Sequence, residues 1–186
     1  MIKLYELIMC SIILFILFLP MLIIAFLIKI DSKGPIIHYS KRIGKNKSEF
    51  FMPKFRTMYL DTPQLATHLL KNPNDHVTKI GKYLRKYSLD ELPQIFSIFR
   101  GDMTFIGPRP ALFNQKDLIT KRDKLNINSL KPGITGLAQV NGRDKLSIDE
   151  KVSIELKYLN NKNLFLNISI IFKTIKKIFY NSEVRH

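Results

Sequence analysis

Two adjacent carboxylates, Asp90 and Glu91, stand in the sequence Ser-Leu-Asp-Glu-Leu-Pro at residues 88–93. Paired carboxylates can supply a nucleophile and a proton acceptor, and beside phosphates they suit Mg²⁺, which binds a few protein oxygens together with substrate oxygens. A structural explanation competes with this chemistry, because Ser88 and Glu91 have the spacing of a helix capping box. Pro93 weighs against the capping box, since it would remove a backbone hydrogen bond inside that helix and favours a helix start nearer to Asp90. Both interpretations stay open on these residues alone.

Four basic residues, Lys54, Arg56, Arg109 and Arg143, lie in segments punctuated by glycine and proline. Arg109 stands between two prolines, so a stiff loop carries its guanidinium, which offers phosphate a planar pair of donors. Lys54 and Arg56 alternate along an apolar segment, and a strand there would turn both to one face. Phosphate binding is the functional hypothesis for all four. Salt bridges (for Arg109, to Asp102) or a solvated face are the structural alternatives.

The charge of the chain indicates anionic partners. There are 30 Lys and Arg residues against 15 Asp and Glu, a net charge of +15. Nucleic acid, an anionic membrane surface and phosphorylated substrates would all fit such an excess. The basic residues lack interleaved aromatics and no nucleic-acid motif is present, so nucleic acid is not an expected partner. One cysteine excludes an internal disulfide, and the four scattered histidines have no zinc-site spacing.

An uncharged apolar run covers residues 7–28. At ~1.5 Å per residue a straight helix of this length would measure ~33 Å, enough to cross a bilayer core of ~30 Å. A cleaved signal peptide fits poorly, because the run is too long and no small-residue cleavage site follows it. We therefore assign residues 1–30 to a membrane helix and residues 31–186 to a membrane-associated domain that carries the candidate catalytic residues.

Pro20 divides the apolar run into two arms, each too short to span a bilayer alone. The helix could therefore span the membrane with a kink, or turn at Pro20 and leave by the face it entered. Hydropathy alone favours the span. Lys3 and Lys29 flank both ends, but nearly all other basic residues follow the run, which predicts that the body is cytosolic.

The positions of apolar residues predict how the rest of the chain folds. We expect strands at residues 36–39 and 49–58, a polar loop at 61–75, an irregular glycine-rich stretch at 131–143, and helices at 76–87, 89–101, 111–125, 147–159 and 164–180. The last helix has apolar residues on one side and lysines on the other, which is typical of a helix lying in the membrane interface. The expected fold class is α-rich α+β with little strand.

Four motifs together resemble a known family. They are KFRTM (54–58), SLDELPQ (88–94), GDMTFIGPRP (101–110) and PGITGLAQVNGR (132–143). In order and spacing they are similar to those of the bacterial sugar transferase family of monotopic phosphoglycosyl transferases. With no large extra domain, the chain resembles the small members that act on polyprenyl phosphates.

The resemblance implies a two-step transfer. Asp90 would attack the β-phosphate of a UDP-sugar, release UMP and hold the sugar phosphate covalently until polyprenol (undecaprenyl) phosphate accepts it. Glu91 would assist by proton transfer or by organising the site, and Mg²⁺ would bind near Asp90. The positively charged family positions at the phosphates and nucleotide match Lys54, Arg109 and Arg143.

The resemblance also implies a location and partners. A helix broken at Pro20 would be re-entrant, which reverses the preference from hydropathy, and the catalytic domain would lie on the cytosolic face of the bacterial inner membrane. There the chain would carry out the first membrane step of glycan or glycoconjugate assembly. Its partners would be the UDP-sugar, polyprenol phosphate and the lipid bilayer. Downstream glycosyltransferases and a second copy of the chain are the protein partners to consider.

The chain departs from the family pattern at four places. Leu19 precedes Pro20 where serine is usual, Ser40 replaces a common glutamine, and Glu155 and Asn167 replace common aspartates.

Two other functions are compatible with the composition. One is a non-enzymatic, membrane-anchored basic protein that binds anionic lipid or nucleic acid, and the other is a glycosyltransferase that moves only the sugar and releases UDP.

Overall fold

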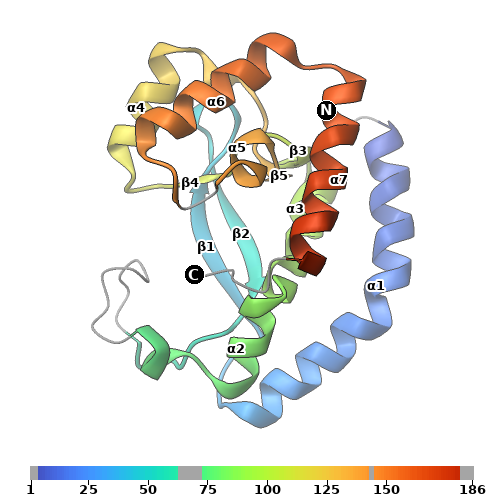
Figure 1. The fold of residues 1–186 in the computed structure, drawn as a ribbon. Coiled ribbons are helices and arrows are strands. Elements are labelled where there is room, and N and C mark those ends of the chain that lie inside the picture. Colours follow the sequence, from blue (N-terminus) through green and yellow to red (C-terminus); the bar gives the residue numbers. More distant parts are fainter. Residues whose placement is uncertain (1–3, 63–72, 143–144, 181–186) are drawn as a thin grey trace.

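The structure, a computed structural model, describes residues 4–62, 73–142 and 145–180 (Figure 1). Its helices are α1 (Leu4–Asp31), α2 (Lys79–Lys86), α3 (Ile95–Arg100), α4 (Lys116–Lys124), α5 (Leu137–Val140), α6 (Ile148–Asn161) and α7 (Leu164–Tyr180). Short 3-10 turns are η1 (Lys45–Lys47), η3 (Pro73–His76), η4 (Leu89–Gln94) and η5 (Ile127–Ser129). The strands are β1 (Ile37–Ile43), β2 (Glu49–Phe55), β3 (Thr104–Ile106), β4 (Ala111–Leu112) and β5 (Gly133–Thr135). The expected helix-rich fold with little strand is confirmed.

A long antiparallel hairpin of β1 and β2 runs through the middle of the molecule (Figure 1). The short β4 pairs with the other edge of β1, giving the order β2-β1-β4, while β3 and β5 form a separate parallel pair. His38 lies directly opposite Lys54 in the hairpin register. Because side chains alternate along a strand, His38, Ser40 and Arg42 share one face of β1. Lys54 lies on the same face of the hairpin and contacts Asp90 and Glu91.

The apolar N-terminal segment forms one continuous helix, α1, with Pro20 inside it. The helix bends near its middle (Figure 1), as expected where a proline removes a backbone hydrogen bond. By length and composition, Glu6–Asp31 could cross a membrane. Each half of α1 also packs on the body of the protein. The cluster with its first half contains Cys10, Phe50, Met52, Ile95, Ile98 and Met103. The cluster with its second half contains Ile24, Ile28, Phe55 and Leu84.

Polar contacts attach both ends of α1 to the body. Glu6, which is buried, accepts a hydrogen bond from Thr104 Oγ1 at 2.5 Å. At the other end, Asp31 Oδ2 accepts from the backbone N–H of Ile80 at 3.0 Å, in the first turn of α2. The two ends of this helix therefore touch the same folded unit.

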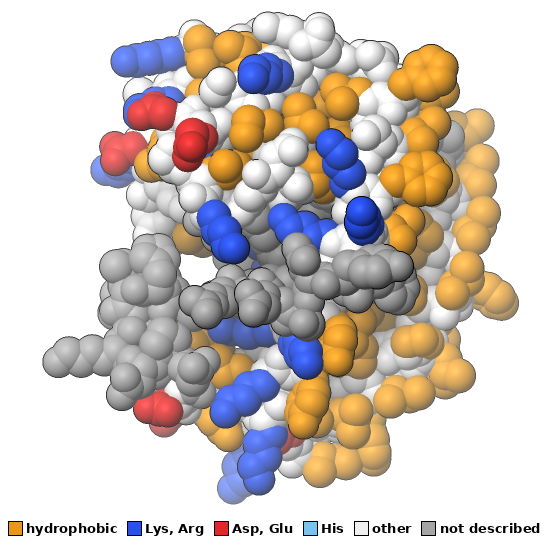
Figure 2. Space-filling model, viewed as in Figure 1, with side chains coloured by type: hydrophobic (Ala, Val, Ile, Leu, Met, Phe, Trp, Pro, Cys, Tyr) orange, Lys and Arg blue, Asp and Glu red, His pale blue; other side chains and the backbone are white. Residues whose placement is uncertain are grey.

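An exposed apolar surface covers much of α1 and α7. Hydrophobic side chains gather along the edge of the molecule that α1 and α7 form, and Lys and Arg side chains lie across the middle of the view (Figure 2). On α1 the exposed members include Ile12, Phe15, Ile16, Phe18, Leu19, Leu22, Ile23 and Phe26. On α7 they are Leu164, Phe165, Ile168, Ile171, Phe172 and Ile175. Extended apolar patches on a protein surface mark contact sites for a membrane or for another protein.

Several predicted elements differ in extent from those observed. The strand expected at 36–39 continues to Ile43, and the helix expected at 111–125 is reduced to α4. Ala111 instead pairs with Ile43 as part of β4, so a tertiary contact replaces local helix formation. The stretch 131–143 contains β5 and α5. Most of the loop expected at 61–75 lies outside the described residues.

Candidate active site

The carboxylate pair lies in η4, immediately before α3. Ser88 has a left-handed backbone (φ 55°) and its side chain makes no capping hydrogen bond, so the capping box is not formed. Because η4 is a 3-10 turn and α3 begins only at Ile95, Pro93 falls before the α-helix rather than inside it. Asp90 is buried, with 6% of its surface exposed. The cap explanation from the sequence is therefore rejected.

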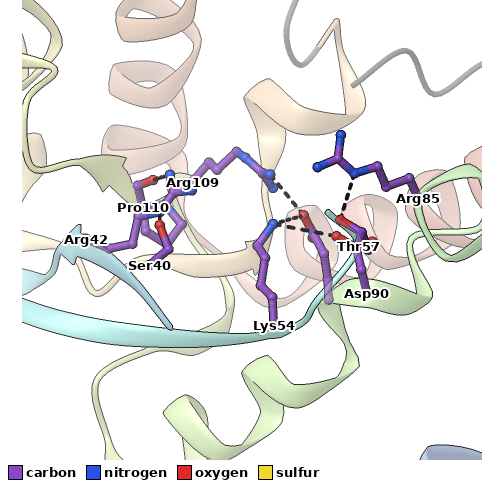
Figure 3. Close-up of polar contacts among 9 residues, drawn as sticks. Ser40, Arg42, Lys54, Thr57, Arg85, Asp90, Arg109 and Pro110 are labelled. Atoms are coloured by element: carbon purple, nitrogen blue, oxygen red, sulfur yellow. Dashed lines mark hydrogen bonds and ion pairs between the residues drawn. The ribbon is translucent and has the colours of Figure 1, made fainter. Parts of the chain in front are cut away.

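The second carboxylate holds two cations. Glu91 Oε1 accepts from Lys54 Nζ and from Arg109 Nη2, each at 2.9 Å (Figure 3). Lys54 Nζ also lies 4.0 Å from Asp90 Oδ2. All four side chains are largely buried, which strengthens these charge interactions relative to a surface pair.

A third cation, Arg85 from α2, lies beside the pair (Figure 3). Arg85 Nε donates to Thr57 Oγ1 at 2.9 Å. Burial lowers the pKa of Arg85, and the negative charge of Asp90 opposes that shift. The sequence interpretation did not single out Arg85, because it stands on a basic helix face that is equally typical of solvated surface.

Burial and neighbouring charges shape the site's electrostatics. Burial lowers the pKa of Lys54. The negative charge of Glu91 opposes this shift, the positive charge of Arg109 adds to it, and the negative charge of Asp90 opposes it. The pKa of His38 is lowered by burial and by the cations Lys54 and Arg42. The site is a strongly positive region in which two carboxylates are embedded.

Arg42 reaches the same region from β1. Its Nε donates to Ser40 Oγ at 3.0 Å and its Nη1 to the carbonyl oxygen of Pro110 at 3.2 Å (Figure 3). Burial, then Arg109, lowers the pKa of Arg42 to about 10 against the opposing effect of Glu91. If the predicted strand at 36–39 were extended to Ile43, alternation along it would place Arg42 on the face of the hairpin that carries Lys54. The longer strand would therefore have identified Arg42.

Two glycines fix the loop that carries Arg109. Gly107 N donates to the carbonyl of Thr135 and Gly133 N to the carbonyl of Pro108, both at 2.9 Å. A Cβ atom on Gly133 would lie 2.1 Å from the backbone nitrogen of Gly107. The two chain segments approach so closely that only glycine fits at this crossing.

The comparisons with known proteins agree with these motifs. The family model described as bacterial sugar transferase matches residues 1–181. The chain belongs to the bacterial sugar transferase family. The resemblance inferred from the sequence is thus confirmed.

The chain is also similar to proteins whose names state a function. A UDP-N-acetylgalactosamine-undecaprenyl-phosphate N-acetylgalactosaminephosphotransferase of Aeromonas hydrophila is 37% identical over 166 residues, covering 85% of this chain and 38% of the relative. An undecaprenyl-phosphate glucose phosphotransferase of Komagataeibacter xylinus is 36% identical over 92% of this chain and 34% of its own. The exopolysaccharide production protein ExoY of Rhizobium meliloti is 36% identical, covering 87% and 78%. The chain spans less than two fifths of the first two relatives.

Most residues predicted for the family site meet in the structure. Asp90, Glu91, Lys54 and Arg109 come from three separate segments and contact one another. Arg143 lies outside the described residues. The alternative salt bridge from Arg109 to Asp102 is not formed: Asp102 pairs with Arg100 at 3.2 Å, and Arg109 pairs with Glu91.

Arg56 is placed away from this cluster. Arg56 is 5% exposed, and its guanidinium donates to the carbonyls of Lys33 and Ser32, the latter at 2.7 Å, and to Ser32 Oγ at 3.0 Å. Because β2 ends at Phe55, the alternation that was expected to put Arg56 beside Lys54 does not continue. Arg56 ties down the segment that follows α1, and we leave it out of the proposed substrate contacts.

The carboxylate pair is chemically suited to Mg²⁺. Among the residues that the structure describes, no group of three or more His, Cys, Asp or Glu side chains could enclose a metal. Mg²⁺ does not require such a cage, since it binds one or two carboxylates and takes its other ligands from phosphates and water. The donor set around Asp90 and Glu91 therefore fits Mg²⁺ bound together with a phosphorylated substrate.

Proposed function

We propose that this chain transfers a sugar 1-phosphate from a UDP-sugar to polyprenol (undecaprenyl) phosphate, with Asp90 as nucleophile. The observation that carries the proposal is the buried Asp90 beside a second carboxylate that holds Lys54 and Arg109 in place. Two relatives bear names that state sugar phosphotransfer to undecaprenyl phosphate. The reaction would begin glycan or glycoconjugate assembly at the bacterial inner membrane.

In the first step, an oxygen of Asp90 attacks the β-phosphorus of the UDP-sugar. The bond between this phosphorus and the bridging oxygen breaks, and UMP leaves with that oxygen. An acyl phosphate joins the sugar to Asp90. Lys54 and Arg109 balance the charge that develops on the phosphoryl oxygens, and Arg85, which interacts electrostatically with Asp90, does the same.

In the second step, a phosphate oxygen of the lipid attacks the same phosphorus and the bond to Asp90 breaks. The carboxylate is regenerated and a polyprenyl diphosphate-linked sugar is released. A phosphate monoester is mostly dianionic at neutral pH, so the acceptor needs no proton removed. Glu91, which accepts from two cations through one oxygen, serves here to organise the site.

We propose that Asp90 is the protein ligand for Mg²⁺, which when bound neutralises charge on the diphosphate. Glu91 is engaged with Lys54 and Arg109, so substrate oxygens and water would complete the shell. Removal of divalent cations with EDTA is expected to abolish UMP release, and added Mg²⁺ is expected to restore it. Full activity in excess EDTA would contradict a metal requirement.

We infer that α1 is re-entrant and that the body lies on the cytosolic face of the membrane. The support is that Glu6 and Asp31, near opposite ends of α1, both bond to the same folded unit. A helix that crossed the bilayer would carry its first turn to the far side, away from that unit. The exposed apolar face of α1 and α7 is then the surface that meets lipid.

Intact-mass measurement tests the chemistry directly. Purified protein is mixed with Mg²⁺ and each member of a panel of UDP-sugars, without acceptor. We expect one sugar-phosphate adduct, accompanied by UMP, with an effective donor. The adduct should be absent in Asp90→Asn. With polyprenol phosphate then added, near-normal turnover by Asp90→Asn would exclude the covalent mechanism, and release of UDP in place of UMP would indicate transfer of the sugar alone.

A further inference from the structure

Each carbonyl oxygen of the loop at residues 108–110 accepts a hydrogen bond from a different part of the chain. The backbone N–H of Gly133 lies 2.9 Å from the first oxygen, Arg122 Nη2 lies 3.1 Å from the second and Arg42 Nη1 lies 3.2 Å from the third. Two of the three loop residues are prolines, which have no N–H to donate. The loop is therefore held mainly through its carbonyls.

The donor to the middle carbonyl, that of Arg109, is itself fixed. Arg122 from α4 forms a two-point ion pair with Glu155 from α6, through Nε–Oε2 at 2.7 Å and Nη2–Oε1 at 2.5 Å. The two side chains are 5% and 2% exposed. A planar guanidinium bound at two points has little freedom, so the remaining hydrogen bond to Arg109 is aimed accurately.

We propose that Arg122 and Glu155 are positioning residues that fix Arg109 where it meets the diphosphate of the donor. The pair acts through the backbone: Glu155 orients Arg122, and Arg122 holds the carbonyl of Arg109. The Arg109 side chain then reaches Glu91 at 2.9 Å. This inference rests on the proposed function, since it gives Arg109 a phosphate to contact.

A purely structural role is the competing explanation, and the energetics distinguish the two. A buried ion pair replaced by apolar residues of similar volume often leaves stability unchanged or improved. If the ion pair only stabilised the fold, this replacement would leave both the stability and the activity nearly unchanged. In this protein the replacement would also remove the donor to the Arg109 carbonyl, and a ~1 Å displacement of a substrate-contacting group can cost about 100-fold in rate.

The test is a mutant cycle with the double variant Arg122→Met/Glu155→Leu, which removes both charges and keeps the volume. It is made in the wild-type and Arg109→Ala backgrounds, with thermal unfolding, UMP release and UDP binding measured. In the wild-type background we expect a folded protein with kcat/KM lowered about 10- to 100-fold. In the Arg109→Ala background we expect a further loss below about twofold, because the group being positioned is already gone.

Lys121 and Asp149 provide the matched control. They form an exposed ion pair with each other between the same two helices, α4 and α6. Lys121→Gln/Asp149→Asn removes both charges there and is expected to leave kcat/KM unchanged. A loss equal to that of the buried pair would mean that any perturbation of the α4–α6 contact lowers activity, and would overturn the proposal.

Other outcomes are equally decisive. Unchanged kcat/KM in Arg122→Met/Glu155→Leu, or an equal loss with and without Arg109, would show that the pair does not act through Arg109. If the double variant fails to fold, Arg122→Lys is put through the same cycle, since one ammonium cannot reproduce the three contacts. If the wild type releases no UMP, the proposed function fails, and UDP affinity across the cycle still decides the positioning role.

Discussion

At the scale of single residues, Glu91 is the centre of the site. One of its oxygens accepts hydrogen bonds from both Lys54 and Arg109, cations that come from β2 and from a loop far along the chain. Without this shared acceptor the two cations would repel each other. The neighbouring Asp90 lies 4.0 Å from one of these cations, Lys54, whose position is set before substrate arrives.

Glu91→Gln is expected to lower kcat/KM about tenfold to a hundredfold. The amide keeps the shape but loses charge-assisted hydrogen bonds, which contribute about 1.5–3 kcal/mol each. UMP release over a range of UDP-sugar concentrations measures the effect, and thermal unfolding checks the fold. Activity equal to wild type would remove Glu91 from the mechanism.

The pKa of His38 depends on the positive charges of the site and can be used to measure their effect. Burial and the nearby Lys54 and Arg42 lower its pKa below the ordinary 6.5, which favours the neutral imidazole. NMR titration of the ring in lipid bicelles, assigned with His38→Gln, should give a midpoint below 6.5. Lys54→Gln removes one cation and should raise that midpoint. No change on removing Lys54 would mean that the two side chains do not face each other.

Residue types alone predicted only part of this site. Asp90, Glu91, Lys54 and Arg109 stand in local motifs, so their chemistry is visible along the sequence. Arg85 meets the site only because α2 packs beside η4, a tertiary contact that no local pattern encodes. Arg56 shows the converse. Its sequence position suggests phosphate binding, but its guanidinium is occupied by backbone carbonyls.

At the scale of elements, α2 depends on a close approach at Gly81. Thr78 caps the helix by accepting from Gly81 N at 2.9 Å, and a Cβ on Gly81 would lie 2.3 Å from the carbonyl oxygen of Thr57. The helix is thus pressed against the segment after β2. Arg85 is one turn further along, and the same contact brings it to Thr57 Oγ1.

Gly81→Ala is expected to lower both stability and activity, although alanine is the better helix former by about 1 kcal/mol. The clash with a backbone oxygen must move α2, and Arg85 moves with it. Unfolding temperature and UMP release should both fall. Lys82→Ala, at the next and exposed position, is the matched control and should change neither. A more stable Gly81→Ala protein would show that α2 is free to shift.

The elements that the sequence predicted well are those with long periodic patterns. The helix expected at 164–180 coincides with α7, and the one expected at 147–159 begins at the same cap, Ser147, as α6. The two- and three-residue strands β3, β4 and β5 were missed. Such short pieces have no period of their own, and pairing with distant strands defines them.

At the scale of the whole molecule, α1 is attached at both ends to the rest of the protein. This attachment predicts on which side of the membrane each end of α1 lies. In sealed vesicles, an impermeant amine reagent should modify Lys29 and Lys3 from the same side. Lys29 follows the bend of α1, and Lys3 precedes the first residue of that helix. Labelling of the two lysines from opposite sides would establish a spanning helix and contradict the re-entrant course.

The attachments at Glu6 and Asp31 also bear on how the protein tolerates different bilayers. A spanning helix must match the hydrocarbon thickness, and each ångström of mismatch costs a fraction of a kcal/mol in tilt or lipid distortion. A helix held at both ends to one body has no opposite surface to reach. We expect specific activity in vesicles of short- and long-chain lipids to agree within about twofold. A sharp optimum at one chain length would show that thickness governs the enzyme, whereas a flat response would let one sequence serve membranes of varied lipid composition.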